Sequence, residues 1–267
     1  MGKNDISVGS TVSMAAVVVA LLNQSGMPTV LVILIPLVMG LAIGAFNGVL
    51  VAKLKFDYWV VAFASMSIFA GLALVLTNGV TIPVKNEVLD WIGNGKILGL
   101  YVIIWITILL VGLMVLVQKK TRFGYNVYSI GGSENVANVS GIKVVKTRIW
   151  VYALAGLFAA VAGVAIACMT NSGSPSVGVE YSFNAMAAVV IGGTSMAGGK
   201  GGILGTVFGT VLLRVLASGL SLMGIPATWQ KALIGVVIVT MIVVDVANEH
   251  RKNIKGLRRV YGHVTGS

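Results

Sequence analysis

The chain has 267 residues, of which 57% are hydrophobic and only 10% are charged. Soluble domains carry about 25% charged residues, so this composition excludes an ordinary soluble protein and predicts a single transmembrane domain over residues 1–267. The formal net charge of +11 comes from short basic patches beside apolar runs. Such patches are typical of loops that flank membrane spans, so nucleic-acid binding is not expected.

Apolar runs alternate with polar segments along the whole chain, and they predict an all-α fold, a polytopic integral membrane helix bundle with about 7–8 hydrophobic segments. In chain order the runs are 8–22, 28–52, 58–77, 97–118, 149–170, 183–196, 203–223 and 227–246. Most have the roughly 20 residues that a helix needs to cross a bilayer. The first run is somewhat short but has no clear signal-cleavage pattern, so we interpret it as a retained span.

The run 183–196 is too short for a full crossing, and Gly192-Gly193 interrupts its end. Irregular backbone at membrane depth is tolerated only where it lines protein or a watery cavity. We therefore expect a broken or re-entrant element here, with a complete span as the alternative. Gly193, Thr194 and Ser195 could then offer polar groups to a solute in the membrane pathway. A purely structural break is the other interpretation.

The distribution of basic residues predicts how the chain is oriented. Lysine and arginine concentrate in 53–57, in 119–148 and in the tail 247–267, which places these segments in the cytoplasm. The segments 78–96 and 171–182 lack an excess of basic residues and are expected to face outward. With the amino terminus inside, the sides alternate correctly through the first five runs.

Two glycine ladders predict close helix packing. They are Gly40, Gly44 and Gly48, and Gly201, Gly205 and Gly209. Small residues four positions apart line one face of a helix and let two backbones approach where lipid gives no hydrophobic driving force. We expect packing within one subunit, with a dimer interface or a moving helix contact as alternatives.

The sequence GGTSMAGGKGG (192–202) lacks the glycine and hydroxyl positions of a phosphate-binding loop, so ATP binding is not expected there.

The residue types needed for catalysis or metal binding are not grouped in this sequence. Cys168 is the single cysteine, and His250 and His263 lie in the tail without partners at metal-ligand spacing, so no metal, catalytic residue or cofactor is expected. Carboxylates fall in loops or at the ends of runs, which argues against proton coupling. Arg214, near the centre of 203–223, is expected to face the bundle, pair or snorkel.

Several segments together resemble one transporter family. These segments are DISVGS (5–10), NG (47–48), SIFAG (67–71), GYNVYSIGG (124–132), AVVIGGTS (188–195) and WQ (229–230). Over nearly the whole chain they resemble the membrane permease subunit of bacterial sugar ABC importers of the ribose/xylose/arabinose/galactoside type. The resemblance implies a multi-pass protein of the bacterial cytoplasmic (plasma) membrane that translocates a monosaccharide, a ribose-like pentose or a hexose.

The resemblance also implies partners. They are ATP-binding ABC subunits, an extracytoplasmic sugar-binding protein and a second permease subunit, identical or a paralogue. Because ATP hydrolysis would occur in the separate subunits, the chain is not expected to be an enzyme. The segment 119–148 would be the loop that couples to the ATPase: Glu134, Ala137 and Gly141 match its E-x-x-A-x-x-x-G pattern, and Ile142 follows. A short helix with a small-residue face and a glycine stop suits such docking.

Asn47 joins Gly193, Thr194 and Ser195 as a candidate for lining the solute pathway.

One departure from the family is at the amino terminus. Family members usually begin with two further hydrophobic segments, and the Gly-Gly-Ile before their Asp-x-Ser-x-Gly motif reads Gly2-Lys3-Asn4 here. These differences predict a truncated, mis-started or split chain.

Two rival functions stay open at this point. A secondary transporter or facilitator for a small polar solute would act without an ATPase, so its transport would be insensitive to ATP. A membrane-embedded enzyme would need a catalytic constellation, which the sequence does not display.

Overall fold

The computed structural model describes residues 1–226, 229, 232, 235–236, 239–240 and 243. Most of the predicted run 227–246 and the whole basic tail 247–267, with His250 and His263, lie outside the described residues. The helices are α1 (Val8–Gln24), α2 (Thr29–Ala52), α3 (Tyr58–Thr77), α4 (Glu87–Asn94), α5 (Val102–Lys120), α6 (Arg122–Gly132), α7 (Glu134–Val139), α8 (Val144–Thr170), α9 (Val179–Ile191) and α10 (Ile203–Leu222). The strands are β1 (Ile82–Pro83), β2 (Lys96–Ile97), β3 (Leu100–Tyr101) and β4 (Ser172–Gly173).

The chain divides into two compact units. Unit 1 comprises Met1–Asn184 and Ala197–Gly199, and unit 2 comprises Ala185–Met196 together with the chain from Lys200 onward. Unit 1 holds α1 to α8 and the four short strands. Unit 2 holds the end of α9 and α10.

The predicted helix bundle is confirmed. Among the described residues, the helices α2, α3, α5, α8 and α10 are long and apolar enough to cross a membrane, and α1 is a shorter apolar helix of 17 residues. α9 has only 13 residues and ends directly before Gly192-Gly193, where the sequence predicts a break. The short α9 therefore fits a broken element better than a full span.

One predicted boundary is wrong. The apolar run 97–118 was expected to be helical from its start, but residues 96–101 form a small antiparallel hairpin, β2–β3, and α5 begins at Val102. The turn of this hairpin has positive φ at Leu98 (52°) and Gly99 (82°). Two successive residues with positive φ favour a tight hairpin turn and cannot belong to a right-handed helix.

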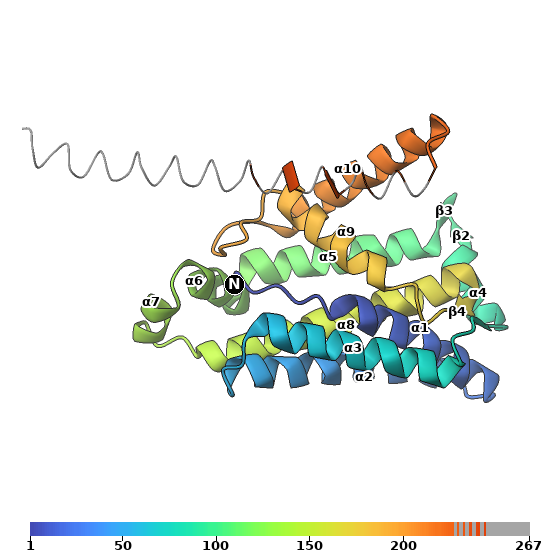
Figure 1. Cartoon of the computed structure of the whole chain (residues 1–267), viewed down its shortest axis with the longest axis horizontal. Helices are drawn as coiled ribbons and strands as arrows, with labels where there is room; N and C mark the ends of the chain where they lie inside the picture. The colour runs from blue at the N-terminus through green and yellow to red at the C-terminus, as the bar shows by residue number, and fades with distance from the viewer. Residues whose placement is uncertain (227–228, 230–231, 233–234, 237–238, 241–242, 244–267) are drawn as a thin grey trace, which may run out of the picture. The chain divides into compact units, whose positions relative to one another are not determined.

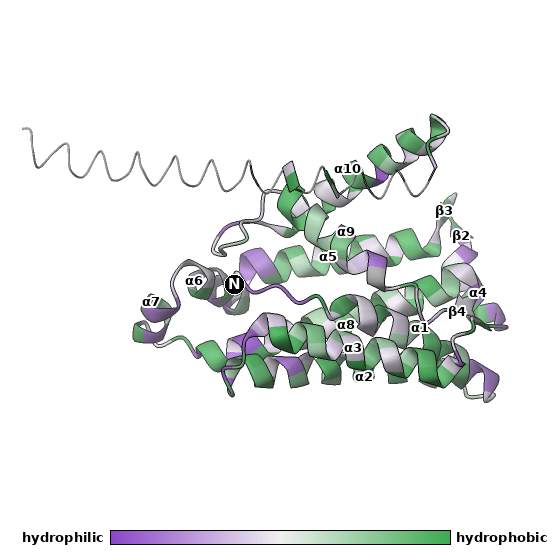
Figure 2. Ribbon diagram, viewed as in Figure 1, coloured by the Kyte–Doolittle hydropathy of each residue, from purple (hydrophilic) through white to green (hydrophobic). Residues whose placement is uncertain are grey.

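The core of unit 1 forms where α1 and α2 pack against α8 (Figure 1). Small side chains on these helices, such as Ala16, Ala20 and Ala167, are fully buried there, and Leu89 of α4 closes one end of the cluster. Many large apolar side chains point outward instead, including Leu109 of α5. Within unit 1, apolar residues dominate the middles of the long helices and polar residues gather at their ends (Figure 2). This is the distribution expected for helices in lipid.

The two ends of unit 1 bring together the segments that the charge pattern assigns to opposite sides of the membrane. At the end predicted to face outward, β1 pairs with β4. There the Asn171 side chain donates a hydrogen bond of 2.7 Å to Asp90 of α4. The pKa of the Asp90 carboxyl lies below its usual range because Asn171 and Asn94 donate hydrogen bonds to it. At the other end lie the first residues of the chain, α6 and α7 (Figure 1).

Candidate functional site: the coupling segment and the polar core

The predicted coupling segment, residues 119–148 (the coupling segment below), contains two capped helices between α5 and α8. The Thr121 hydroxyl accepts a hydrogen bond of 3.3 Å from the Gly124 amide at the start of α6. The Ser133 hydroxyl accepts one of 3.3 Å from the Val136 amide at the start of α7. Side-chain oxygens at these positions satisfy amides that have no partner within the helix, so the sequence itself fixes where α6 and α7 begin.

α7 ends in a glycine-dependent turn. Gly141 has a φ of 79°, and the Ile142 amide donates to the Ala137 carbonyl at 3.0 Å. A residue with a Cβ is disfavoured at this φ, which explains the glycine that follows the short helix. Ala137 is only 2% exposed because it packs with Ile130 and Val144. Its small side chain therefore fits α7 onto the rest of unit 1.

The surface of α7 is formed by other residues, which the sequence reasoning missed. Val136 is 64% exposed and Val139 is 91% exposed. Their spacing of three residues on a short polar helix was the available signal, because residues three apart lie on one face. Exposed valines at this end of the unit are candidates for contact with another protein.

An ion pair ties α7 to α8. The Arg148 Nη2 atom donates to Glu134 Oε2 at 2.6 Å. Arg148 is 6% exposed, whereas about half of the Glu134 side chain is exposed. The hydrogen bond from Arg148 holds the pKa of the Glu134 carboxyl below its usual range, and burial opposes this shift only partly. Within the described residues, Arg148 Nε has no hydrogen-bond partner.

A chain of buried hydrogen bonds joins the start of α1 to α2 and α3. The Ser65 hydroxyl donates to Asn47 Oδ1 at 2.5 Å, and Asn47 Nδ2 donates to the Ser7 hydroxyl at 3.0 Å. The Ser7 hydroxyl and amide both donate to Asp5, at 2.6 and 2.9 Å. Asn47, a candidate for pathway lining, is 1% exposed, and its amide is occupied on both sides. Asp5 and Ser7 of the DISVGS motif thus hold the entry of α1 in place.

The first glycine ladder lies where α2 meets α8. A Cβ added at Gly40 would overlap the backbone of Gly156, one at Gly44 would overlap the backbone of Tyr152, and one at Gly48 would lie 2.9 Å from the Ile149 Cα. These contacts are between two helices of the same chain. The absence of side chains on α2 therefore lets the two backbones touch over two turns.

The second ladder and the other pathway candidates lie in unit 2. Gly205 and Gly209 belong to α10, but Gly201 precedes the helix with a φ of 132°, so the prediction that all three line one helix face is wrong. A Cβ at Gly209 would overlap the Ala188 carbonyl, and one at Gly205 would overlap Gly192. The α9 helix is closed by backbone bonds from Gly193 (φ 79°) to Val190 and from Thr194 to Val189.

The irregular segment that follows is held by Thr194 and Ser195. The Ser195 amide donates to the Lys200 carbonyl at 3.1 Å, and a Cβ at Gly201 would meet the Thr194 side chain. Gly193, Thr194 and Ser195 are thus brought together at the break between α9 and α10. On α10, Arg214 is exposed within its unit and shares a shallow groove with Thr210 and Ser218.

Comparison with known proteins identifies the family. A family model described as "Branched-chain amino acid transport system / permease component" matches residues 1–242. The ribose import permease protein RbsC of Bacillus subtilis (strain 168) is 36% identical over 246 residues, which cover 91% of this chain and 76% of that protein. RbsC of Escherichia coli (strain K12) is 35% identical, over 90% of this chain and 76% of its own length.

A third relative is the xylose transport system permease protein XylH of Escherichia coli (strain K12), 31% identical over 92% of this chain and 79% of its own length. No solved structure matches the chain. Permeases of this kind are multi-pass membrane proteins that work with an ATP-binding subunit, which carries the ATPase activity, and with a substrate-binding protein. The chain therefore belongs to the family of membrane permease subunits of ABC importers that includes the ribose and xylose import permeases.

Proposed function

We propose that the chain translocates a monosaccharide, a ribose-like pentose or a hexose, that an extracytoplasmic binding protein delivers. The observation that carries the proposal is the similarity to ribose and xylose import permeases over at least 90% of the chain. Neutral sugars also suit the chemistry of the chain. No carboxylate lies within α2, α3, α5, α8 or α10, and Arg214 of α10 is the one charged residue away from the ends of these described spans. They therefore offer a solute mainly polar uncharged groups and backbone.

The coupling segment is the proposed contact with the ATP-binding subunit. In this proposal Val136 and Val139 insert into the partner, while Ala137 keeps α7 seated on unit 1. Gly141 and Ile142 form the turn through which α7 passes a displacement to α8. The exposure of the two valines and the burial of Ala137 support this division of roles.

The displacement is proposed to move α8, α2 and α1 as one block. Arg148 binds α7 to the first turns of α8 through Glu134. One turn later, Tyr152 touches the backbone of α2 at Gly44, and Asn47 of α2 holds Ser7 at the start of α1. Close backbone packing transmits rigid-body movement better than a flexible side-chain interface, because it can deform little. Rotation of this block would open one side of the pathway and close the other.

The pathway itself is proposed to involve Gly193, Thr194 and Ser195 of unit 2, where a short helix ends in irregular, hydroxyl-bearing backbone. Asn47 is proposed to stabilise the pathway wall, because its amide is already occupied by Ser7 and Ser65. A second permease subunit, identical or a paralogue, would complete the pathway.

The choice of sugar is tested by uptake in cells that express the chain together with its ATP-binding subunit and its binding protein. Labelled ribose, xylose, arabinose and galactose are compared. A branched-chain amino acid is the control, because the description of the family model names branched-chain amino acid transport. Uptake of one of the sugars, suppressed when the same unlabelled sugar competes, is expected. Uptake of the amino acid in place of any sugar would contradict the proposal.

A further inference from the structure

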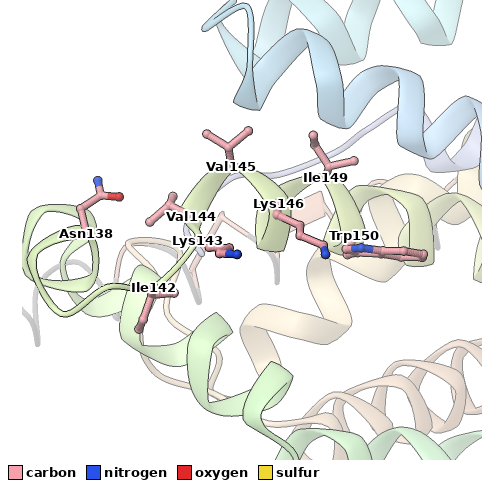
Figure 3. A pocket seen from close by; sticks show the side chains of 8 residues that line it. All are labelled: Asn138, Ile142, Lys143, Val144, Val145, Lys146, Ile149 and Trp150. Atoms are coloured by element: carbon pink, nitrogen blue, oxygen red, sulfur yellow. The ribbon is translucent and has the colours of Figure 1, made fainter.

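The beginning of α8 carries a groove to which the proposed transport steps assign no ligand. Two open grooves adjoin there and share four lining residues, Ile142, Lys143, Lys146 and Trp150. We call the part lined by these four residues the basic groove. Val145 and Ile149 extend its lining on one side. Figure 3 shows Lys143, Lys146 and Trp150 along one side of the first turns of α8, with Val145 and Ile149 on another.

The length of α8 places this groove at the membrane surface. Its 27 residues rise about 40 Å, which exceeds the roughly 30 Å of hydrocarbon in a bilayer. The uncharged part of α8 begins at Ile149, directly after Lys146 and Arg148. The surplus is therefore at the amino-terminal end, where the charged residues reach the headgroup layer. Trp150, 49% exposed, then lies at the depth where tryptophan is enriched in membrane proteins.

The charge of the groove is uncompensated within the described part of the chain. Neither Lys143 nor Lys146 forms an ion pair there, and the ion pair described at this end of unit 1 joins Glu134 to Arg148. Both lysines are exposed, and their spacing of three residues puts their ammonium groups on one face. Two free ammonium groups above an apolar, aromatic lining match a molecule with an anionic head and a hydrocarbon tail.

We propose that the basic groove binds one anionic phospholipid of the cytoplasmic leaflet. Lys143 and Lys146 contact the headgroup phosphate, and an acyl chain lies along Trp150 and Ile149. Basic pockets beside membrane helices on the cytoplasmic side recognise anionic headgroups in this way, and each lysine near such a surface strengthens binding about fivefold. The lipid would brace the turn at Ile142, through which α7 joins α8.

The test uses the fluorescence of Trp150 in the full chain. The protein is reconstituted in vesicles of equal parts phosphatidylcholine and phosphatidylglycerol, with bromine on the acyl chains of one lipid or the other, so that membrane charge stays constant. The fluorescence quenching of Trp150 is obtained by subtracting the quenching measured in Trp150→Phe from that measured in the parent protein. This subtraction removes the contribution of the other tryptophans. Brominated phosphatidylglycerol is expected to quench Trp150 more strongly than brominated phosphatidylcholine.

A matched pair of double variants identifies the groove. Lys143→Gln/Lys146→Gln should lower the preference for phosphatidylglycerol by up to about thirtyfold. Lys119→Gln/Lys120→Gln removes the same charge from exposed positions at the end of α5 and should leave the preference unchanged. Equal quenching by both lipids, or an equal loss in both double variants, would overturn the proposal. A third result would also overturn it: the Lys143/Lys146 variant keeps its lipid preference but no longer binds the ATP-binding subunit. That result would show that the groove is a contact with the protein partner. Since the assay needs neither sugar nor ATP, its failure leaves the proposed transport function untouched.

Discussion

Arg148 and Glu134 form an ion pair of 2.6 Å that joins the buried start of α8 to the exposed short helix α7. The two residues are 14 positions apart, and the turn at Gly141 and Ile142 lies between them. The pair gives α7 a direct connection to the packed helices of unit 1. Its position predicts that the ion pair affects coupling between ATP hydrolysis and uptake more than it affects folding.

Replacing Glu134 with alanine should therefore reduce the amount of sugar imported per ATP hydrolysed severalfold, because α7 would lose its charged link to α8. The cost in stability should be about 1–3 kcal/mol, because solvent screens the half-exposed Glu134 carboxylate but its loss leaves the buried Arg148 guanidinium without its partner. The measurement is uptake and ATPase activity in the same proteoliposomes. Glu87→Ala, an exposed carboxylate on α4, is the matched control and should keep the parent ratio.

The double reversal Glu134→Arg/Arg148→Glu extends this prediction. Each single reversal places two like charges at the pair and should abolish coupling, and the double variant should recover part of it. No recovery in a double variant that still inserts into the membrane would show that the pair has another role.

The pH dependence of the ion pair follows from the lowered pKa of Glu134, which the hydrogen bond from Arg148 causes. A carboxyl whose pKa is lower in the folded protein stabilises the fold fully above its ordinary range, and this contribution is lost as the pH falls through the lowered value. The stability difference between the parent and Glu134→Gln should thus be constant between about pH 6 and pH 8 and should shrink below about pH 4. Thermal unfolding in detergent across this range measures it. A difference that changes between pH 6 and pH 8 would contradict the assignment.

Gly44 should tolerate no side chain. A Cβ there would overlap the backbone of Tyr152, which cannot move aside as a side-chain end could, so Gly44→Ala should destabilise the protein by about 1–3 kcal/mol. Gly71 on α3 has nothing within 4 Å of an added Cβ. Gly71→Ala is therefore the control, with an expected gain of up to about 1 kcal/mol from helix propensity. Equal melting temperatures for the two variants would argue against close packing of α2 on α8.

Gly141 separates two requirements of the coupling segment. Its φ of 79° favours glycine, and the space around an added Cβ is open. Gly141→Asn should keep coupling largely intact, because asparagine adopts positive φ more readily than most residues. Gly141→Glu should insert into the membrane normally but uncouple ATP hydrolysis from uptake, because it adds backbone strain and a charge at the proposed contact. Sugar-stimulated ATPase activity and uptake are compared for both variants, and parent-like values for Gly141→Glu would refute this placement.

Much of the fold was predictable because each long apolar helix corresponds to a continuous run of apolar residues in the sequence. The run 58–77 coincides with α3, where the Asp57 carboxylate caps the first turn by accepting a hydrogen bond of 2.8 Å from Trp59. The run 97–118 failed at its start because hydropathy cannot distinguish a hairpin from a helix in a short apolar stretch. There the deciding feature was backbone conformation, positive φ at Leu98.

The candidate site was less predictable, because its interactions join residues far apart in the sequence. Asn47 was expected to line a pathway as a polar residue in an apolar run, but its partners Ser7 and Ser65 are 40 and 18 positions away. The pattern around Ala137 predicts a coupling segment, yet it did not reveal that this side chain faces inward and Val139 faces outward. Side-chain direction on a short helix depends on what the helix packs against, and periodicity over six residues carries too little information to give it.

The central claim is that this permease imports sugar only when a separate subunit supplies ATP hydrolysis. The direct test is uptake of the labelled sugar into liposomes that contain the chain alone, or the chain with its ATP-binding subunit, each with the binding protein outside and ATP inside. Accumulation is expected only with the ATP-binding subunit, and it should stop when that subunit cannot hydrolyse ATP. Accumulation by the chain alone, unaffected by ATP, would contradict the account and indicate a secondary transporter.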